Sequence, residues 1–368
     1  GMRGSHAGSF EVAHQLQKGR RWLADEVDDS GEHYDLVVVG GGLSGLSAAW
    51  FYRQAMPGAR ILILDNHDDF GGHAKRNEFW HGDRMLLSHG GTINMQNFNW
   101  YGEPAQKLIR SLGIDPYRYS EFVDQDLYRS LGLRNGIFFA EETFGTDRLV
   151  AGTGEPGWRE FLAKTPLSET AREEIARLYE SEVDYLAGLD RDQKRERLRS
   201  MSYQDFLREY AGMGPEALLF MKSDSYWAID IDALPAWVAL WDGAPGTRAL
   251  GFEDRPEESV YFRFPDGNAS IARLLVRSMI PAVAHGSTME DVVTAQFDYS
   301  RLDDPGSATR IRLNSTVVDV RHIGPAQEAQ RVRITYVQDC RARSVSAGRT
   351  VLACYNSIIP HLCETLPE

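Results

Sequence analysis

The chain has 368 residues, of which 42% are hydrophobic and 25% charged, and its formal net charge is −13 with a pI near 5.3. This composition is typical of a globular enzyme with one large or two smaller cores. The acidic balance argues against a nucleic-acid partner and favours cationic ligands if it is concentrated at a cleft. No apolar run approaches the roughly 18 residues that cross a bilayer, so no membrane span is predicted.

Three cysteines, Cys340, Cys354 and Cys363, give no disulfide framework and no paired metal-ligand spacing. We therefore predict no metal site.

The first elements along the chain form a βαβ pattern. Residues 1–30 are polar and are interpreted as an N-terminal arm. A buried strand at Tyr34–Val39 is followed by a glycine turn, a helix at Leu46–Gln54 and a second strand at Arg60–Asp65. Met56-Pro57-Gly58 ends the helix, as proline and glycine usually do.

The middle of the chain reads as helical, with an amphipathic stretch from Ser168 to about Leu186 and shorter pieces at Tyr203–Tyr210 and Pro215–Met221. A further helix is expected at Ala269–Ile280, ended by Pro281. The period then changes to that of strands, which are expected at Ile311–Val320, Arg331–Val337 and Thr350–Cys354.

These elements predict an α/β fold with a Rossmann-like dinucleotide-binding domain made of two separate segments, residues 31–105 and 256–368. Residues 106–255 are predicted to form a largely helical insert that carries the substrate region.

The motif Gly40-x-Gly42-x-x-Gly45 lies directly after the first strand and directly before the first helix of the βαβ pattern. In this context the glycines allow a tight turn, close approach of a pyrophosphate and close packing of strand and helix, with the phosphates at the helix N-terminus. Asp65, with Asn66 beside it, ends the second strand, where a carboxylate accepts hydrogen bonds from an adenosine ribose. The predicted phosphate contacts are Gly40, Gly42, Leu43, Ser44 and Gly45.

A second glycine pair, Gly71-Gly72, follows Asp65 closely and would bring another stretch of backbone past the same dinucleotide. Here the chain resembles the flavin amine oxidases, whose fold is of the glutathione-reductase type and whose cofactor is FAD. His73 stands where that family usually has arginine, and Lys75 or Arg76 are candidates to replace its charge. The resemblance also implies flavin contacts at Gly90, Gly91 and Thr92, and an adenine contact at Val318.

Within that superfamily the chain resembles the spermidine dehydrogenases most, in stretches that include Leu64–Lys75, His89–Thr92, Met201–Leu207 and Ala353–Asn356. The resemblance implies oxidation of a small cationic amine by hydride transfer, with an external electron acceptor other than oxygen. It also adds haem to the expected cofactors, with His6 and His14 as candidate ligands or, alternatively, as plain surface histidines.

The family fold normally continues beyond the length seen here, so we expect the C-terminal half to be missing and this chain to associate with it. The catalytic residues are consequently unknown. The resemblance is compatible with a periplasmic location, with the export signal absent from this chain, but the residues themselves do not indicate a compartment.

Trp227, Asp230 and Asp232, with Trp237 and Trp241 nearby, combine aromatic rings and carboxylates that suit a polyamine. The alternative is a structural cluster of core tryptophans and helix-capping aspartates.

Four other functions remain open at this point. The same FAD fold also serves enzymes of amino acids or polyenes, because fold does not fix chemistry. A non-catalytic carrier on this scaffold and an NAD-dependent dehydrogenase are the other two alternatives, which a bound flavin would exclude.

Overall fold

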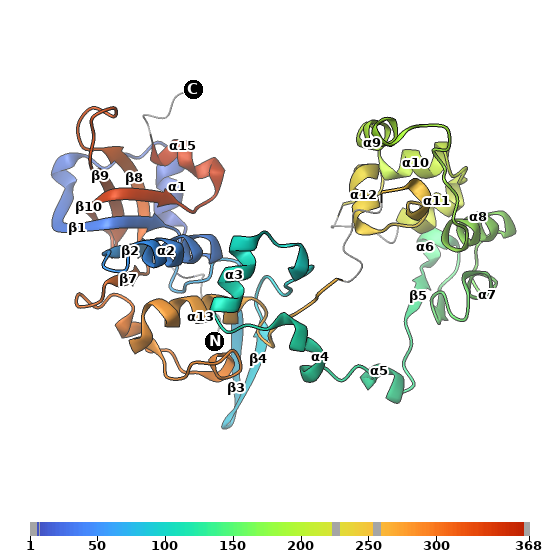
Figure 1. Cartoon of the computed structure of the whole chain (residues 1–368), viewed down its shortest axis with the longest axis horizontal. Coiled ribbons are helices and arrows are strands. Elements are labelled where there is room, and N and C mark those ends of the chain that lie inside the picture. Colours follow the sequence, from blue (N-terminus) through green and yellow to red (C-terminus); the bar gives the residue numbers. More distant parts are fainter. Residues whose placement is uncertain (1–5, 7, 223–228, 253–258, 364–368) are drawn as a thin grey trace. The chain divides into compact units, whose positions relative to one another are not determined.

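The computed structural model describes residues 6, 8–222, 229–252 and 259–363. The chain divides into two compact units, the first formed by Gly1–Phe122 with Glu258–Glu368 and the second by Val123–Glu257 (Figure 1). Each unit has hydrophobic clusters of its own. No helix in the described ranges is long and apolar enough to cross a bilayer.

The first unit is built on a six-stranded sheet of order β7-β2-β1-β10-β9-β8 (Figure 1). Four of its strands, β7, β2, β1 and β10, are parallel, and β9 is antiparallel to both of its neighbours. The strand bounds are β1 Val27–Val39, β2 Ile61–Leu64, β7 Thr309–Arg312, β8 Thr316–His322, β9 Val332–Gln338 and β10 Arg341–Leu352. The predicted α/β fold with a Rossmann-like sheet is confirmed.

The central strands are continuous apolar runs because both faces of the sheet are covered. Alternate residues of β1 point to opposite faces, so Val38 joins a cluster with helices α2 (Leu43–Ala55) and α13 (Ala269–Met279). Val37 joins a second cluster that includes Ile334 of β9 on the other face. The glycine turn follows at the carboxyl end of β1, before α2 begins.

The remaining elements of the first unit surround this sheet. The strands β3 and β4 pair as a hairpin that extends from the unit (Figure 1). The bounds are α1 Glu11–Gln17, β3 Arg76–His81, β4 Arg84–His89, α3 Glu103–Ser111, α4 Tyr119–Phe122, α14 Asp291–Thr294 and α15 Ile359–Leu362.

The N-terminal arm is more structured than its polar composition suggests. Strand β1 begins at Val27, which pairs with Ala342 of β10, so the last residues of the predicted arm belong to the sheet. Leu16 of α1 is buried in the same cluster as Val37. The polar composition of residues 27–30 does not indicate a strand. They form one because their backbone bonds to β10, a partner more than 300 positions away in the sequence.

The first unit also extends further than residue 105. Helix α3 packs with the first unit because Leu108 and Ile109, on its apolar side, join the core of α2 and α13. The second unit therefore begins at Val123 in the structure rather than at residue 106. The expected strand Ile311–Val320 is divided as well, because Asn314 adopts a left-handed conformation with φ of 54° between β7 and β8.

The second unit is mainly helical. Its largest helix, α8, begins after Ser168, whose hydroxyl caps the helix by accepting from the N–H of Ala171. The unit has one short hairpin, β5 with β6, among its described residues. The longer elements are β5 Gly136–Phe139, β6 Arg148–Ala151, α7 Trp158–Leu162, α8 Glu169–Glu180, α9 Arg191–Arg199, α10 Tyr203–Glu209, α11 Pro215–Lys222 and α12 Ala236–Asp242.

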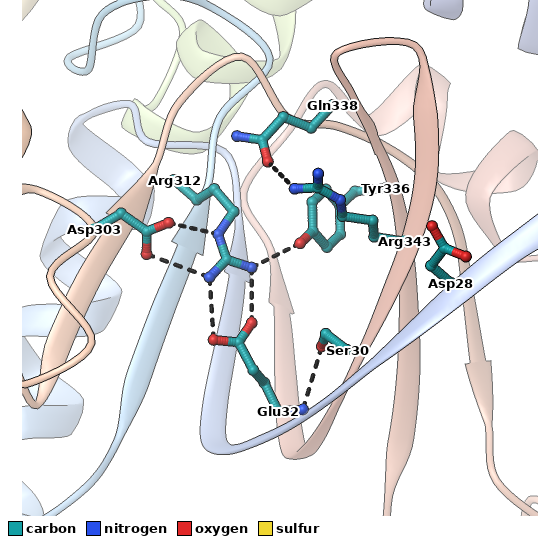
Figure 2. Close-up of a pocket in the computed structure, with 8 residues that line it drawn as sticks. All are labelled: Asp28, Ser30, Glu32, Asp303, Arg312, Tyr336, Gln338 and Arg343. Atoms are coloured by element: carbon teal, nitrogen blue, oxygen red, sulfur yellow. Dashed lines mark hydrogen bonds and ion pairs between the residues drawn. The ribbon is translucent and has the colours of Figure 1, made fainter.

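An ion-pair network joins β7 to β1 beside a cavity of about 310 Å³ (Figure 2). Arg310 and Arg312 lie two residues apart on β7, so both point to the same face, and each pairs with Glu32 and Asp303. Burial opposes ionisation of Glu32, but the hydrogen bonds and charges of the two arginines outweigh it and lower the pKa of Glu32 to about 2.

We predict that Glu32→Gln destabilises the protein by about 2 kcal/mol at pH 7, a value reduced for the partial exposure of Glu32. Because the folded pKa of Glu32 is lower than its ordinary value of 4.5, its charge stabilises the fold above that pH and this contribution is lost as the pH falls towards 2. Urea unfolding should therefore show a difference between the variant and the wild type that shrinks below pH 4.

Glu26→Gln is the matched control, because Glu26 pairs with Arg20 on the exposed surface. It should leave the unfolding midpoint unchanged within error. An equal effect of both substitutions would contradict a special role for the network of Figure 2.

Candidate dinucleotide-binding site

The glycine turn after β1 is closed by backbone on two sides. Gly40 has φ of +106°, and a Cβ atom at this position would lie 2.5 Å from the carbonyl oxygen of Ala353, just beyond β10. A Cβ atom on Gly45 would lie 1.9 Å from the carbonyl oxygen of Gly40. Only glycine fits at both positions without displacement of the backbone.

The turn leads directly into the N-terminus of α2. Gly42 is the N-cap and supplies no side-chain cap, and the first intrahelical bond runs from the N–H of Leu46 to the carbonyl of Gly42 at 2.9 Å. The N–H groups of the first helical turn, those of Leu43, Ser44 and Gly45, therefore lie where an α-helix presents donors to an anion. This arrangement fits the diphosphate of a dinucleotide.

Asp65 lies at the end of β2 and is buried beside the turn. Its Oδ2 accepts from the N–H of Gly41 at 2.6 Å and its Oδ1 accepts from the N–H of His67 at 2.8 Å. Burial raises the pKa of Asp65, and the two backbone donors act in the opposite direction. A carboxylate has about four lone-pair sites, so Asp65 can still accept hydrogen bonds from ribose hydroxyls.

The residues after Asp65 meet the start of β8. The N–H of Ser315 donates to the carbonyl of Asp65 at 2.8 Å, and the Thr316 hydroxyl donates to Oδ1 of Asn66 at 2.5 Å. Val318 lies two residues further, at a bulge where β8 skips one residue in its pairing with β9. A bulge leaves the backbone of that residue unpaired in the ladder, which suits the predicted adenine contact.

The second glycine pair packs against the first turn. The N–H of Gly71 donates to the carbonyl of Gly41 at 2.7 Å, and Gly42 and Gly71 form an isolated parallel bridge. A Cβ atom on Gly72 would lie 3.0 Å from Cα of Gly42. The two glycine segments, although far apart in sequence, thus make one backbone surface.

The third glycine pair continues this surface. A Cβ atom on Gly91 would lie 2.0 Å from the carbonyl oxygen of His73, and the N–H of Thr92 donates to that carbonyl at 2.8 Å. The preceding N–H, of Gly90, donates to the carbonyl of Lys75. The imidazole of His73 lies 2.8 Å from the hydroxyl of Tyr355.

Tyr355 was not among the predicted site residues. The signal that could have identified it is its position three residues after β10, at the same sheet end as the glycine turn. The side chain of His73 therefore has a partner from a distant part of the chain. The predicted cofactor residues all belong to the first unit. Asp65 and the start of β8 adjoin the glycine turn, and the segments that contain Gly71 and Thr92 continue from it.

The candidate substrate residues of the second unit have partners of their own. Trp227 lies outside the described residues. Asp230 and Asp232 lie 2.9 and 3.9 Å from Nζ of Lys222, and the Arg199 guanidinium lies 5.4 Å from the ring centre of Trp237. Cations of the chain itself already occupy these groups, which favours a structural cluster over a polyamine site.

The two arm histidines are also placed. His6 lies 3.3 Å from the carbonyl of Asn66, and the exposed His14 stacks on Phe10. No group of three histidine, cysteine, aspartate or glutamate residues in the described part of the chain is arranged to hold a metal ion. A haem needs only one or two axial side chains, so its ligand stays a prediction from resemblance.

Comparison with known proteins agrees with this geometry. Residues 38–111 match a family described as an NAD(P)-binding Rossmann-like domain. Coproporphyrinogen III oxidase of Propionibacterium freudenreichii subsp. freudenreichii is 40% identical over 83 residues, 22% of this chain and 14% of the relative. A probable flavin-containing monoamine oxidase A of Dictyostelium discoideum is 42% identical over 50 residues, 13% of this chain and 10% of the relative.

Among solved structures, a putative protoporphyrinogen oxidase from an Exiguobacterium species has a TM-score of 0.46 and 18% identity. Putrescine oxidase bound to putrescine has a TM-score of 0.43 and 17% identity. Each alignment covers 91% of this chain and 62% of the solved chain. The chain thus spans less than two thirds of these proteins. The sheet topology and the match of residues 38–111 define a Rossmann-like dinucleotide-binding domain.

We predict that Gly45→Ala destabilises the protein by roughly 2 to 3 kcal/mol, because its methyl group must displace the Gly40 backbone. Gly58→Ala is the control, since Gly58 has open space around its Cβ position and no positive φ. Its effect should stay within about 0.5 kcal/mol in urea unfolding. Equal stability of the two variants would contradict the close approach of the Gly45 and Gly40 backbones.

Proposed function

We propose that this chain is the FAD-binding part of a flavoprotein oxidoreductase that oxidises amines. The observation that carries the proposal is the contact of Gly71 and Gly72 with the first glycine turn. This contact supports a second stretch of backbone along the dinucleotide, as the resemblance to flavin amine oxidases implies. The local identity to a flavin-containing monoamine oxidase supports the same cofactor.

The residues of the chain have separate tasks in this proposal. The first turn of α2 holds the diphosphate, and Asp65 accepts hydrogen bonds from the ribose hydroxyls. The unpaired backbone of Val318 contacts the adenine edge, and the Gly90–Thr92 segment lies alongside the flavin ring. FAD, when bound, supplies the redox step by accepting hydride, while the protein contributes position and exclusion of water.

The substrate in this proposal is a small cationic polyamine such as spermidine. Loss of hydride from the carbon next to nitrogen gives an iminium, which water hydrolyses to an aldehyde and a shorter amine. The electrons pass to an external acceptor other than oxygen. The spermidine dehydrogenase resemblance and the net charge of −13 support this substrate class.

An NAD(P)-dependent enzyme is the second candidate, because the family matched by residues 38–111 is described as NAD(P)-binding. Asp65 favours an unphosphorylated ribose in that case.

An absorbance spectrum of the purified chain from about 300 to 700 nm, before and after anaerobic addition of spermidine, tests the proposal. Flavin bands that bleach with spermidine are the expected result. A retained flavin that stays oxidised would exclude spermidine for this form of the protein. A protein that binds NADH but no FAD would support the second candidate.

Asp65→Asn is predicted to weaken FAD binding roughly ten- to hundredfold, because the carboxylate accepts charge-assisted hydrogen bonds. Asp35→Asn is a matched control at the other end of the βαβ unit, where Asp35 accepts from the N–H of Arg60 at 2.8 Å. Fluorescence titration of FAD into the apoproteins measures both. Equal affinity of the Asp65→Asn variant and the wild type would contradict the ribose contact.

A further inference from the structure

The first unit contains a second cavity, of about 640 Å³, between the β3–β4 hairpin, the N-terminal part of α13 and residues 294–299. Of the residues predicted at the cofactor, Arg76, a candidate to balance the diphosphate charge, lines it and pairs there with Glu78 and Asp266. Its volume lies within the range of small-molecule sites. The residues that hold FAD in the proposal above lie outside this lining.

One wall of the cavity carries the guanidinium of Arg273, a residue that is only 5% exposed. Its Nε donates to the carbonyl of Val292 at 3.2 Å, and its Nη2 donates to the carbonyl of Ala295. Its Cζ lies 3.9 Å from the ring centre of Phe297. Within the described residues, Nη1 has no hydrogen bond and the guanidinium has no ion pair with a carboxylate.

Arg277, one helical turn further along α13, shows what a paired arginine looks like in this core. It is equally buried, at 6% exposed, and its Nη1 pairs with the carboxylate of Asp291. Its Nη2 donates to the carbonyl of Thr288 at 2.8 Å. A buried charge is costly without a counter-ion, so the lack of one at Arg273 requires an explanation.

The carboxylates nearest to this part of the cavity are engaged elsewhere. Glu78 and Asp266 both pair with Arg76, and Asp266 also accepts from the hydroxyl of Ser270 at 2.8 Å. Burial, together with the neighbouring charge of Arg76, lowers the pKa of Arg273 to about 10, although Tyr299, Asp266 and Glu78 act in the opposite direction. The cationic form of Arg273 is thus held at an electrostatic cost that an anion in the cavity would relieve.

The other walls are mixed, with aromatic and apolar side chains beside polar groups that include the carboxylates of Asp69 and Glu78. Phe70, Trp80, Met85 and Phe297 line the cavity, and Trp80 is 58% exposed on the hairpin. Phe70 stacks on Tyr299 at 5.8 Å between ring centres. A ligand of this site combines an apolar ring with an anionic group.

We propose that this cavity binds a small organic carboxylate with an aromatic ring, whose carboxylate pairs with Arg273 and whose ring packs against Trp80 and Phe297. The guanidinium offers a planar donor set that matches a carboxylate. The aromatic and apolar side chains of the lining remove the ring from water.

Isothermal titration of the full chain with benzoate tests the proposal. Benzoate should bind, whereas benzyl alcohol, which keeps the ring and lacks the charge, should bind at least tenfold more weakly. Equal affinity for the two would overturn anion recognition. Preference for phenyl phosphate over benzoate would overturn the carboxylate assignment, and binding of none of the three would overturn the site.

Variants then place the site on Arg273. Arg273→Gln should weaken benzoate binding roughly ten- to hundredfold, while Arg277→Lys, which keeps the charge facing Asp291, should not change it. Trp80→Ala, on the exposed hairpin, should weaken binding without an effect on folding and serves if Arg273→Gln does not fold. Unchanged binding in both Arg273→Gln and Trp80→Ala would overturn the proposal, whatever the flavin content of the protein.

Discussion

The close approach of backbone at the end of β1 is the constraint on which the rest of the first unit depends. The turn at Gly40 lies between α2 and the end of β10, so no side chain fits at Gly40 or Gly45. This closeness allows Asp65 to reach the N–H of Gly41 and brings Gly71 against the same turn. The candidate site is therefore made mostly of main-chain atoms. Substitution of side chains outside the site should change its geometry little.

The first unit also shows three ways in which a buried arginine is accommodated. Arg312 has two carboxylate partners and a tyrosine hydroxyl, and Arg277 has one carboxylate and backbone carbonyls. Among the described residues, Arg273 contacts backbone carbonyls and an aromatic ring and has no ion pair with a carboxylate. The three arginines have similar exposed fractions. They differ in their counter-charges, from the network that joins β7 and β1 to the guanidinium of Arg273, which lines the second cavity.

The sequence was sufficient where the signal is local. Strand, glycine turn, helix and acid follow one another within residues 34–65, so the βαβ unit and Asp65 were predicted from spacing alone. The partners of Glu32 and His73 were not predictable, because Arg312 and Tyr355 lie more than 250 positions away and no local period connects them. The apolar side of α3 predicts a helix from local spacing, but the core on which it packs is formed by residues distant in the sequence and was not predictable.

The pairing of β1 with β10 has a consequence for the order of events during synthesis. Ser30 donates to the carbonyl of Ser344 across 314 positions, and the strand that closes the glycine turn is synthesised after the whole second unit. The helical second unit is complete well before that moment and is free to fold first, since its contacts are largely its own. The glycine turn is consequently closed only after β10 has been synthesised, later than the second unit can fold.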